Sequence, residues 1–290
     1  MHADLFPACF LYPDFYFDLL SIHIQCESTQ LQMIGSPGRN RMEKLDEKLD
    51  QLERDGVLLI EGALSPEETA RIRDRIFYAR AQGWEEGLNT VGNMWFDTLL
   101  DREPDIYGPI VGHPSVAPIL FAMMGKQCQL RSYRAHINPG PYLQEWHMDF
   151  YGYWNEKRNA ARHRLAITPS SINTTFYFQD NEPGQAHLKF IKNGHLSEPP
   201  YLHPKIEHAK FEVWCGEQEH VILYPKAGDA VVFLSHIPHQ GAKEDDNMER
   251  CNVVCHYQTC PMYEGVWYVS SPRPFKGSFP FHKMETVEAN

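Results

Sequence analysis

The part of the sequence that decides the fold reads Gly228-Asp229-Ala230-Val231-Val232-Phe233-Leu234-Ser235-His236-Ile237-Pro238-His239-Gln240-Gly241. Its run of β-branched and aromatic residues predicts a short buried strand at 230–234, bounded by glycine on one side and by serine and proline on the other. Similar runs recur at 129–137, 174–178, 221–224 and 251–258. Because no helical periodicity separates them, the pattern favours a sandwich or barrel over alternating strands and helices.

The segment before these strands has helical patterning instead. Leu45, Leu49 and Leu52 form one apolar stripe among charged residues, which predicts a helix. Ser65-Pro66-Glu67-Glu68 carries the cap, the N1 proline and the capping-box glutamate of another helix start. We expect helices at 42–55, from 65 onward and at 114–124, with a strand at 57–60. The fold class expected is mainly β: a double-stranded β-helix (a cupin-like jelly roll) that N-terminal α-helices buttress.

The first 41 residues differ in character from the rest. The stretch after Cys26 is polar and rich in turn formers, which indicates a flexible connector. We predict that residues 1–41 are a dispensable N-terminal extension. Residues 42–290 are then one domain, whose jelly-roll core lies at about 126–260, and a chain of 290 residues is long enough for this.

The composition excludes several classes of function. The chain has 38 acidic and 27 basic side chains, a net charge of −11, which argues against nucleic-acid binding. No stretch reaches the roughly 20 apolar residues that span a bilayer, and no signal peptide is recognisable. The seven cysteines include no pair of CxxC motifs, which indicates reduced thiols. We therefore expect a cytoplasmic protein with neither membrane nor nucleic-acid partners.

The stretch Gln144–Asp149 carries the chemistry. His147 and Asp149 are two residues apart, so on an extended strand both side chains point to the same face and can occupy two positions around a metal. Alone the pair is weak evidence, because His-x-Asp also occurs by chance on surfaces. With a distant third histidine it becomes the facial triad of non-heme Fe(II) oxygenases, which leaves three metal positions open.

His236 and His239 compete for the third position. They are three residues apart, so on a straight strand they face opposite sides. If the strands on either side of the polar turn 242–247 pair as a hairpin, Arg250 lies directly opposite His239. We therefore favour His239 as the ligand. Arg250 is predicted to bind the far carboxylate of a 2-oxo acid, because a guanidinium makes paired hydrogen bonds to carboxylates.

These residues reveal a likeness to a known family. Over roughly 49–257 the chain resembles the phytanoyl-CoA dioxygenase family of Fe(II)/2-oxoglutarate-dependent oxygenases. The likeness rests on the segments 52–60 and 64–68, on Trp146–Asp149, on Gly228-Asp229, and on His239 followed by Arg250 eleven residues later. The resemblance implies a double-stranded β-helix with Fe(II) bound by His147, Asp149 and His239. It also implies O2 as the oxidant and 2-oxoglutarate bound by Arg250.

The chain departs from the family's pattern at two places. Lys192-Asn193-Gly194-His195 replaces the usual Pro-Gly-Ser-His, and we expect His195 to be structural rather than a ligand. Gln240-Gly241 stands where many relatives have Gly-Ser, which removes a hydroxyl that contacts 2-oxoglutarate. Thr174 or Thr175, on the middle strand, is the candidate substitute, and Thr175 is our choice.

Other residues near these motifs are expected to serve packing. His256 follows Arg250 by six residues on the same strand face, and we interpret it as a hydrogen-bonded core histidine. Aromatic side chains crowd the first motif, where most are expected to pack the barrel and one or two to wall the substrate pocket: Trp146, Phe150, Tyr151, Tyr153 and Trp154.

The leading hypothesis is a dioxygenase that decarboxylates 2-oxoglutarate to succinate and CO2 while it hydroxylates or desaturates a free small molecule of specialised metabolism. Ascorbate is expected to support it in vitro. The carboxylate at 149 favours hydroxylation, because halogenating relatives lack it and so make room for chloride. One alternative is a jelly-roll binding protein that has lost its iron, against which the intact triad argues. Another is a cupin-type metalloenzyme without 2-oxoglutarate, in which Arg250 would have no function beside the metal.

Overall fold

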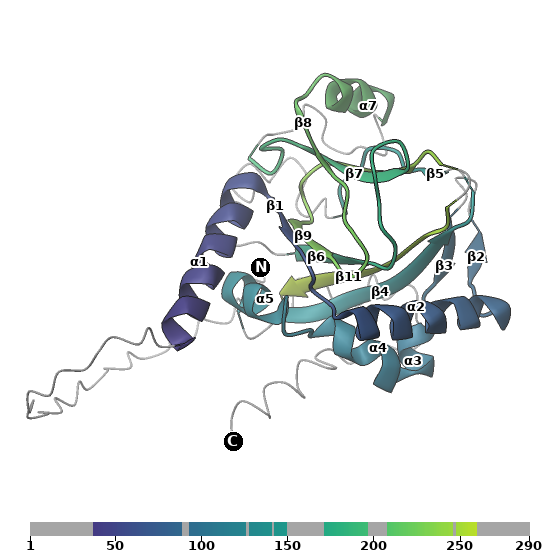
Figure 1. Cartoon of the computed structure of the whole chain (residues 1–290). Coiled ribbons are helices and arrows are strands. Elements are labelled where there is room, and N and C mark those ends of the chain that lie inside the picture. Colours follow the sequence, from purple (N-terminus) through teal and green to yellow (C-terminus); the bar gives the residue numbers. More distant parts are fainter. Residues whose placement is uncertain are drawn as a thin grey trace, which may run out of the picture.

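Two antiparallel sheets face each other in the computed structural model, which describes residues 37–88, 93–125, 128–140, 142–149, 171–196, 208–245 and 248–259 (Figure 1). The larger sheet contains β1 (Val57–Ile60), β2 (Gly87–Leu88), β3 (Met94–Phe96), β4 (Cys128–Asn138), β6 (Ser171–Tyr177), β9 (Ala230–Leu234) and β11 (Arg250–Thr259). The smaller sheet contains β5 (Tyr142–Leu143), β7 (Ala186–Ile191), β8 (His220–Leu223) and β10 (His239–Lys243). Their strand orders are β1-β9-β6-β11-β4-β3-β2 and β5-β10-β7-β8. The predicted mainly β jelly roll is confirmed.

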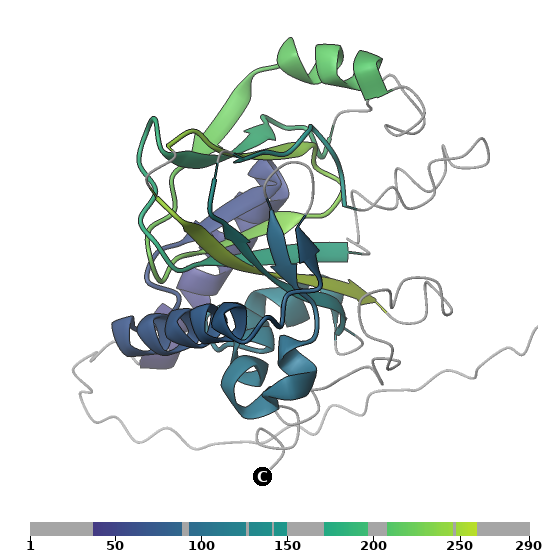
Figure 2. The same cartoon turned by 90° about the vertical axis from the view of Figure 1, so that its right-hand side faces the viewer.

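Helices cover the face of the larger sheet that is turned away from the smaller one (Figures 1 and 2). Helix α7 (His208–Gly216) lies elsewhere, beside the smaller sheet. Among the described residues, no helix is both long and apolar enough to cross a membrane. The covering helices are α1 (Pro37–Asp55), α2 (Pro66–Ala81), α3 (Leu99–Arg102), α4 (Pro104–Val111) and α5 (Ala117–Met124).

The helix boundaries partly follow the predictions. Ser65 and Glu68 form the predicted capping box at the start of α2. Helix α1 begins at Pro37, so residues 37–41, which the sequence pattern places in the connector, are helical. The helix expected at 114–124 corresponds to α5, which begins three residues later, at Ala117. Helix α4, at Pro104–Val111, precedes it and was not predicted. Residues 1–36 lie outside the described part, and the division of the chain at 41 stays a prediction.

The main core lies between the larger sheet and its helices. The odd-numbered side chains of β11 face this core, as do those of β4 from Tyr133 onward, and the register places Cys251 opposite Ile137 and Cys255 opposite Tyr133. Before the register irregularity at Arg131, the core-facing residues of β4 are Cys128 and Leu130. Burial raises the pKa of the Cys251 and Cys255 thiols to about 12, so they remain protonated packing groups. Because successive side chains alternate across a strand, the even-numbered residues of β11, and those of β4 from Ser132 onward, face the smaller sheet.

Gly56 fixes the corner where α1 passes into β1. It ends the helix with φ +73°, and its N–H donates to Leu52 O at 2.9 Å. A Cβ at this position would lie 2.5 Å from His195 Nδ1 and 3.0 Å from Ile237 Cδ1. The corner is therefore packed directly against the turn that leads into β10.

We predict that Gly56→Ala destabilises the protein by roughly 2–5 kcal/mol, because a positive φ and an overpacked contact both cost free energy. Gly62→Ala is the matched control, since Gly62 also has a positive φ, +57°, but nothing lies within 4 Å of the place that a Cβ would take there. The control should lose only the conformational part, roughly 1–2 kcal/mol. Denaturant unfolding measures both, and equal losses would show that the contact with His195 is unimportant.

Candidate active site

Two of the predicted metal ligands are neighbours across a backbone bridge. His147 N donates to His239 O at 3.0 Å, and His239 N donates to His147 O at 2.9 Å. A residue pair that exchanges both bonds in this way has a fixed spacing and orientation. The two imidazole rings consequently lie side by side, with their centroids 4.2 Å apart.

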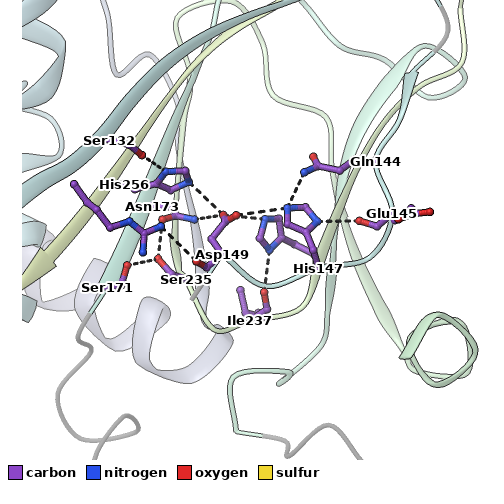
Figure 3. A network of polar contacts seen from close by, with 12 residues as sticks. Ser132, Gln144, Glu145, His147, Asp149, Ser171, Asn173, Ser235, Ile237 and His256 are labelled. Atoms are coloured by element: carbon purple, nitrogen blue, oxygen red, sulfur yellow. Dashed lines mark hydrogen bonds and ion pairs between the residues drawn. The ribbon is translucent and has the colours of Figure 1, made fainter. Parts of the chain in front are cut away.

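Asp149 completes the cluster from two residues beyond His147 (Figure 3). Its Oδ1 lies 3.6 Å from His147 Nε2, and its Oδ2 lies 3.3 Å from His239 Nε2. One potential ligand atom from each of the three residues lies within 4.8 Å of the others. The structure therefore brings His147, Asp149 and His239 together between the two sheets.

The hydrogen bonds of the two rings leave the correct nitrogens for a metal. His147 Nδ1 donates to Glu145 O at 2.9 Å, and His239 Nδ1 donates to Ile237 O at 2.9 Å. Each Nε2 therefore carries a lone pair that faces the cluster. Burial, with a smaller effect from His239, lowers the pKa of His147 to about 4, which keeps the ring neutral at pH 7.

The carboxylate complements these rings. Burial raises the pKa of Asp149, but His239 and His256 outweigh that effect and hold the pKa well below its usual range. Two neutral imidazoles and one ionised carboxylate are the donor set of a non-heme Fe(II) centre with open coordination positions. The donors present thus fit iron.

His236 takes no part in this cluster. Strand β9 ends at Leu234 and β10 begins at His239, so His236 lies in the turn between them rather than on a straight strand. Its ring is buried, which lowers its pKa to about 4, and it faces His195. His195 Nε2 bonds to Glu53 O at 2.8 Å, which agrees with the structural role expected of it.

The predicted hairpin between His239 and Arg250 is wrong. The two residues begin consecutive strands, but β10 belongs to the smaller sheet and β11 to the larger one. His239 pairs with Phe190, whereas Arg250 pairs with Asn138. Arg250 nevertheless approaches β10 across the barrel, because a Cβ at Gly241 would lie 3.6 Å from its Nη2. The two side chains therefore face a common interior from opposite sheets.

Arg250 has the surroundings of an anion-binding residue. The side chain is 6% exposed, and Nη1 donates to Asn138 Oδ1 at 3.0 Å. The guanidinium carbon lies 5.4 and 5.7 Å from the ring centroids of Tyr142 and Tyr177. Its Nε has no hydrogen-bond partner, and among the described residues no carboxylate pairs with the guanidinium. With the Asn252 amide turned so that its oxygen faces Arg250, Nη1 and Nη2 donate to that oxygen at 3.2 and 2.8 Å. A buried guanidinium in this condition fits a carboxylate ligand.

Several residues around Asp149 were not recognised from the sequence. His256, interpreted as a core histidine, is half-buried and hydrogen-bonded, but its Nε2 also lies 3.4 Å from Asp149 Oδ2. The Asn173 amide donates to the same oxygen. Arg131 sits at an irregularity in the β4–β11 register and donates to Asp149 O at 3.4 Å. Such bulges re-aim side chains at active sites.

The remaining predicted residues have simpler positions. Thr175 is 4% exposed and lies on β6 between Val231 and Val254, and its contact with 2-oxoglutarate stays a prediction. Trp146 is buried in a cluster that includes Phe211 of α7, so it packs rather than walls a pocket. Its backbone N–H donates to Glu212 Oε1 at 2.6 Å, which ties α7 to the ligand segment. Residues 150–154 lie outside the described part.

A double-stranded β-helix with this triad between its sheets and a buried arginine in the same interior is an Fe(II)/2-oxoglutarate-dependent oxygenase. The sequence profile of phytanoyl-CoA dioxygenase (PhyH) matches residues 52–245, and the chain belongs to this family. The predictions of the family, the dioxygenase class and the iron and 2-oxoglutarate cofactors are thereby confirmed.

Individual relatives are distant. The ectoine dioxygenase of Bordetella parapertussis is 24% identical, over 83% of this chain and 87% of its own length. The epimerase SnoN of nogalamycin biosynthesis, in complex with Fe3+, alpha ketoglutarate and nogalamycin RO, has 15% identity and a TM-score of 0.61, covering 81% of this chain and 92% of SnoN. EctD from S. alaskensis, with 2-oxoglutarate and 5-hydroxyectoine, has 16% identity and a TM-score of 0.60, covering 80% and 82%.

Proposed function

We propose that the protein hydroxylates a free small molecule, with His147, Asp149 and His239 as its iron ligands and Arg250 as the residue that binds the far carboxylate of 2-oxoglutarate. When bound, iron and 2-oxoglutarate together supply the oxidising power, and succinate and CO2 leave. Desaturation needs the same residues and is the variant reaction. The complexes of EctD with 5-hydroxyectoine and of SnoN with nogalamycin RO support this substrate class.

The observation that carries the proposal is the buried guanidinium of Arg250, which has no carboxylate partner among the described residues and lies in the same interior as the triad. Leaving such a charge without an anion costs several kcal/mol, about the penalty of a broken buried ion pair. If 2-oxoglutarate binds Arg250 through one carboxylate and the metal through its other end, it accounts both for the guanidinium, which pairs with no carboxylate in the described part of the chain, and for the triad nearby. Neither a binding protein without iron nor a cupin without 2-oxoglutarate explains them together.

The chain's own residues also prepare the site. The amide of Gln144 lies with Nε2 2.8 Å from His147 Nε2, so it must release that nitrogen when the metal binds. Gln144 Oε1 accepts from Tyr142 at 2.7 Å, and Tyr142 stacks near Arg250. Through Gln144 and Tyr142, these contacts connect the metal-ligand candidate His147 with the anion-binding candidate Arg250.

A reducing, cytoplasmic location is part of the proposal. The described cysteines, Cys128, Cys215, Cys251 and Cys255, are all free and buried, which supports it.

The test is to load the protein with Fe(II) without oxygen, then add 2-oxoglutarate, ascorbate, air and a metabolite extract, and measure succinate. We expect succinate formation that a chelator abolishes, and one metabolite of the extract should be converted to a product one oxygen heavier. Iron binding without succinate would favour the cupin alternative. No iron binding at all would favour the binding-protein alternative.

A further inference from the structure

One rung of the larger sheet faces the carboxylate of Asp149 (Figure 3). The register pairs Ser132 on β4 with His256 on β11, and His256 with Asn173 on β6. Three polar side chains therefore stand in a row on the inner face of the sheet. The second and third both meet Oδ2 of Asp149, His256 at 3.4 Å and Asn173 through its amide.

The orientation of the Asn173 amide is fixed from behind. Ser235 Oγ donates to Asn173 Oδ1 at 2.7 Å, and Ser171 Oγ donates to Ser235 Oγ at 2.8 Å. These three side chains are at most 1% exposed. Since the amide oxygen already accepts from Ser235, the NH2 group must point toward Asp149.

The orientation of His256 is fixed in the same way. Ser132 Oγ lies 2.5 Å from His256 Nδ1. With the hydroxyl donating to Nδ1, the ring proton is on Nε2, where it faces the carboxylate. Among the described residues, Asp149 Oδ1 has one polar neighbour, His147 Nε2 at 3.6 Å, whereas Oδ2 lies 3.3 Å from His239 Nε2 in addition to its contacts with His256 and Asn173.

We propose that Asn173 and His256 are positioning residues that hold Oδ2 of Asp149, so that Asp149 binds the metal through Oδ1 alone. This inference rests on the proposed function. Three protein ligand atoms leave three metal positions, two for 2-oxoglutarate and one for dioxygen. If Oδ2 also bound, it would take one of them. The rung Ser132–His256–Asn173 thus keeps the number of open positions at three.

The test measures metal binding rather than turnover. Apoprotein is titrated with Co(II) against a chromogenic chelator, for the wild type, Asn173→Leu, His256→Leu and His256→Gln. We expect both Leu variants to bind Co(II) roughly 10–100-fold more weakly, the usual effect of losing a group that orients a ligand. His256→Gln should restore much of the affinity, because its amide can donate from about the position of Nε2. Thermal unfolding shows that each variant is folded.

The ligand-field spectrum of bound Co(II) is the second readout, because it depends on coordination number. We expect the Leu variants to show a higher coordination number as Oδ2 joins the metal. His187→Leu is the matched control: His187 is 6% exposed and lies on β7, where it contacts Glu244 and Tyr224 rather than the triad. It should leave both the affinity and the spectrum unchanged.

The outcomes separate the two proposals. If the wild type binds no Co(II) in competition with the chelator, the proposed function fails. If the wild type binds but folded Leu variants match it in affinity and spectrum, the positioning role is wrong while the metal site stands. Should Asn173→Leu not fold, Ser235→Ala replaces it, because Ser235 orients the Asn173 amide. Should His256→Leu not fold, Ser132→Ala replaces it. Releasing the Asn173 amide or the His256 ring should then weaken binding and alter the spectrum, and an unchanged result would overturn the inference.

Discussion

His239→Gln is expected to abolish 2-oxoglutarate decarboxylation, whereas His236→Gln is expected to keep it. His239 presents Nε2 to the triad from the first residue of β10, and a neutral amide is a much poorer iron ligand than imidazole. His236 lies in the turn before β10, where its side chain faces His195 and stays outside the triad. Its replacement should cost at most about 1–3 kcal/mol of stability, the usual loss for a buried hydrogen-bonding group.

Succinate formation, iron content after anaerobic loading, and thermal unfolding measure these effects. The pair is informative because the two residues are close in sequence, are both buried and receive the same substitution. Activity lost at 236 and kept at 239 would refute the ligand assignment. Loss in both variants together with normal folding would mean that the turn 235–238 itself shapes the metal site.

Arg250→Lys is expected to raise the KM for 2-oxoglutarate at least tens-fold while the metal affinity stays the same. Lysine keeps the positive charge but loses the two-pronged guanidinium, and loss of a buried paired contact costs about 2–5 kcal/mol. Lysine also lacks the planar group that lies against Tyr142 and Tyr177. Succinate formation at a series of 2-oxoglutarate concentrations gives the KM.

Arg75→Lys is the matched control for this prediction. Arg75 also makes a paired contact, with Nε 2.8 and 2.6 Å from the two carboxylate oxygens of Glu103, but it lies on α2 in the helical layer. Its replacement should leave the KM for 2-oxoglutarate unchanged. If Arg250→Lys also left it unchanged, another cation would have to bind the carboxylate.

The strands and most of the site were predictable because they depend on local patterns. Ala230–Leu234 and Val57–Ile60 have the predicted bounds, since a compact apolar run between turn formers leaves few alternatives. The two-residue spacing of His147 and Asp149 likewise places both side chains together wherever the segment lies.

The partner of each strand was not predictable from such patterns. Consecutive strands usually pair, but β10 and β11 enter different sheets, and nothing within 244–249 indicates this. Arg250 approaches β10 from the opposite sheet. Pairing residues across an assumed hairpin does not predict such a contact between sheets.

The inner polar face was overlooked for a related reason. On β4, Ser132, His136 and Asn138 alternate with apolar residues, as they would on a strand with one face in water. In this protein the polar face of the strand instead lines the interior of the barrel, around the candidate metal site. His256 and Asn173 belong to the same face, which is why their contact with Asp149 could not be recognised from sequence spacing.

The bridge between His147 and His239 has a consequence for the inheritance of this fold. Their closeness is maintained by main-chain hydrogen bonds, which any two residues other than proline would make. Substitution of both histidines could therefore abolish metal binding while the fold stays the same, and the fold could then serve another function. A homologue can thus share this backbone fold without being an enzyme. Whether it can bind a metal depends on the side chains at the positions of His147 and His239, which the backbone hydrogen bonds do not determine.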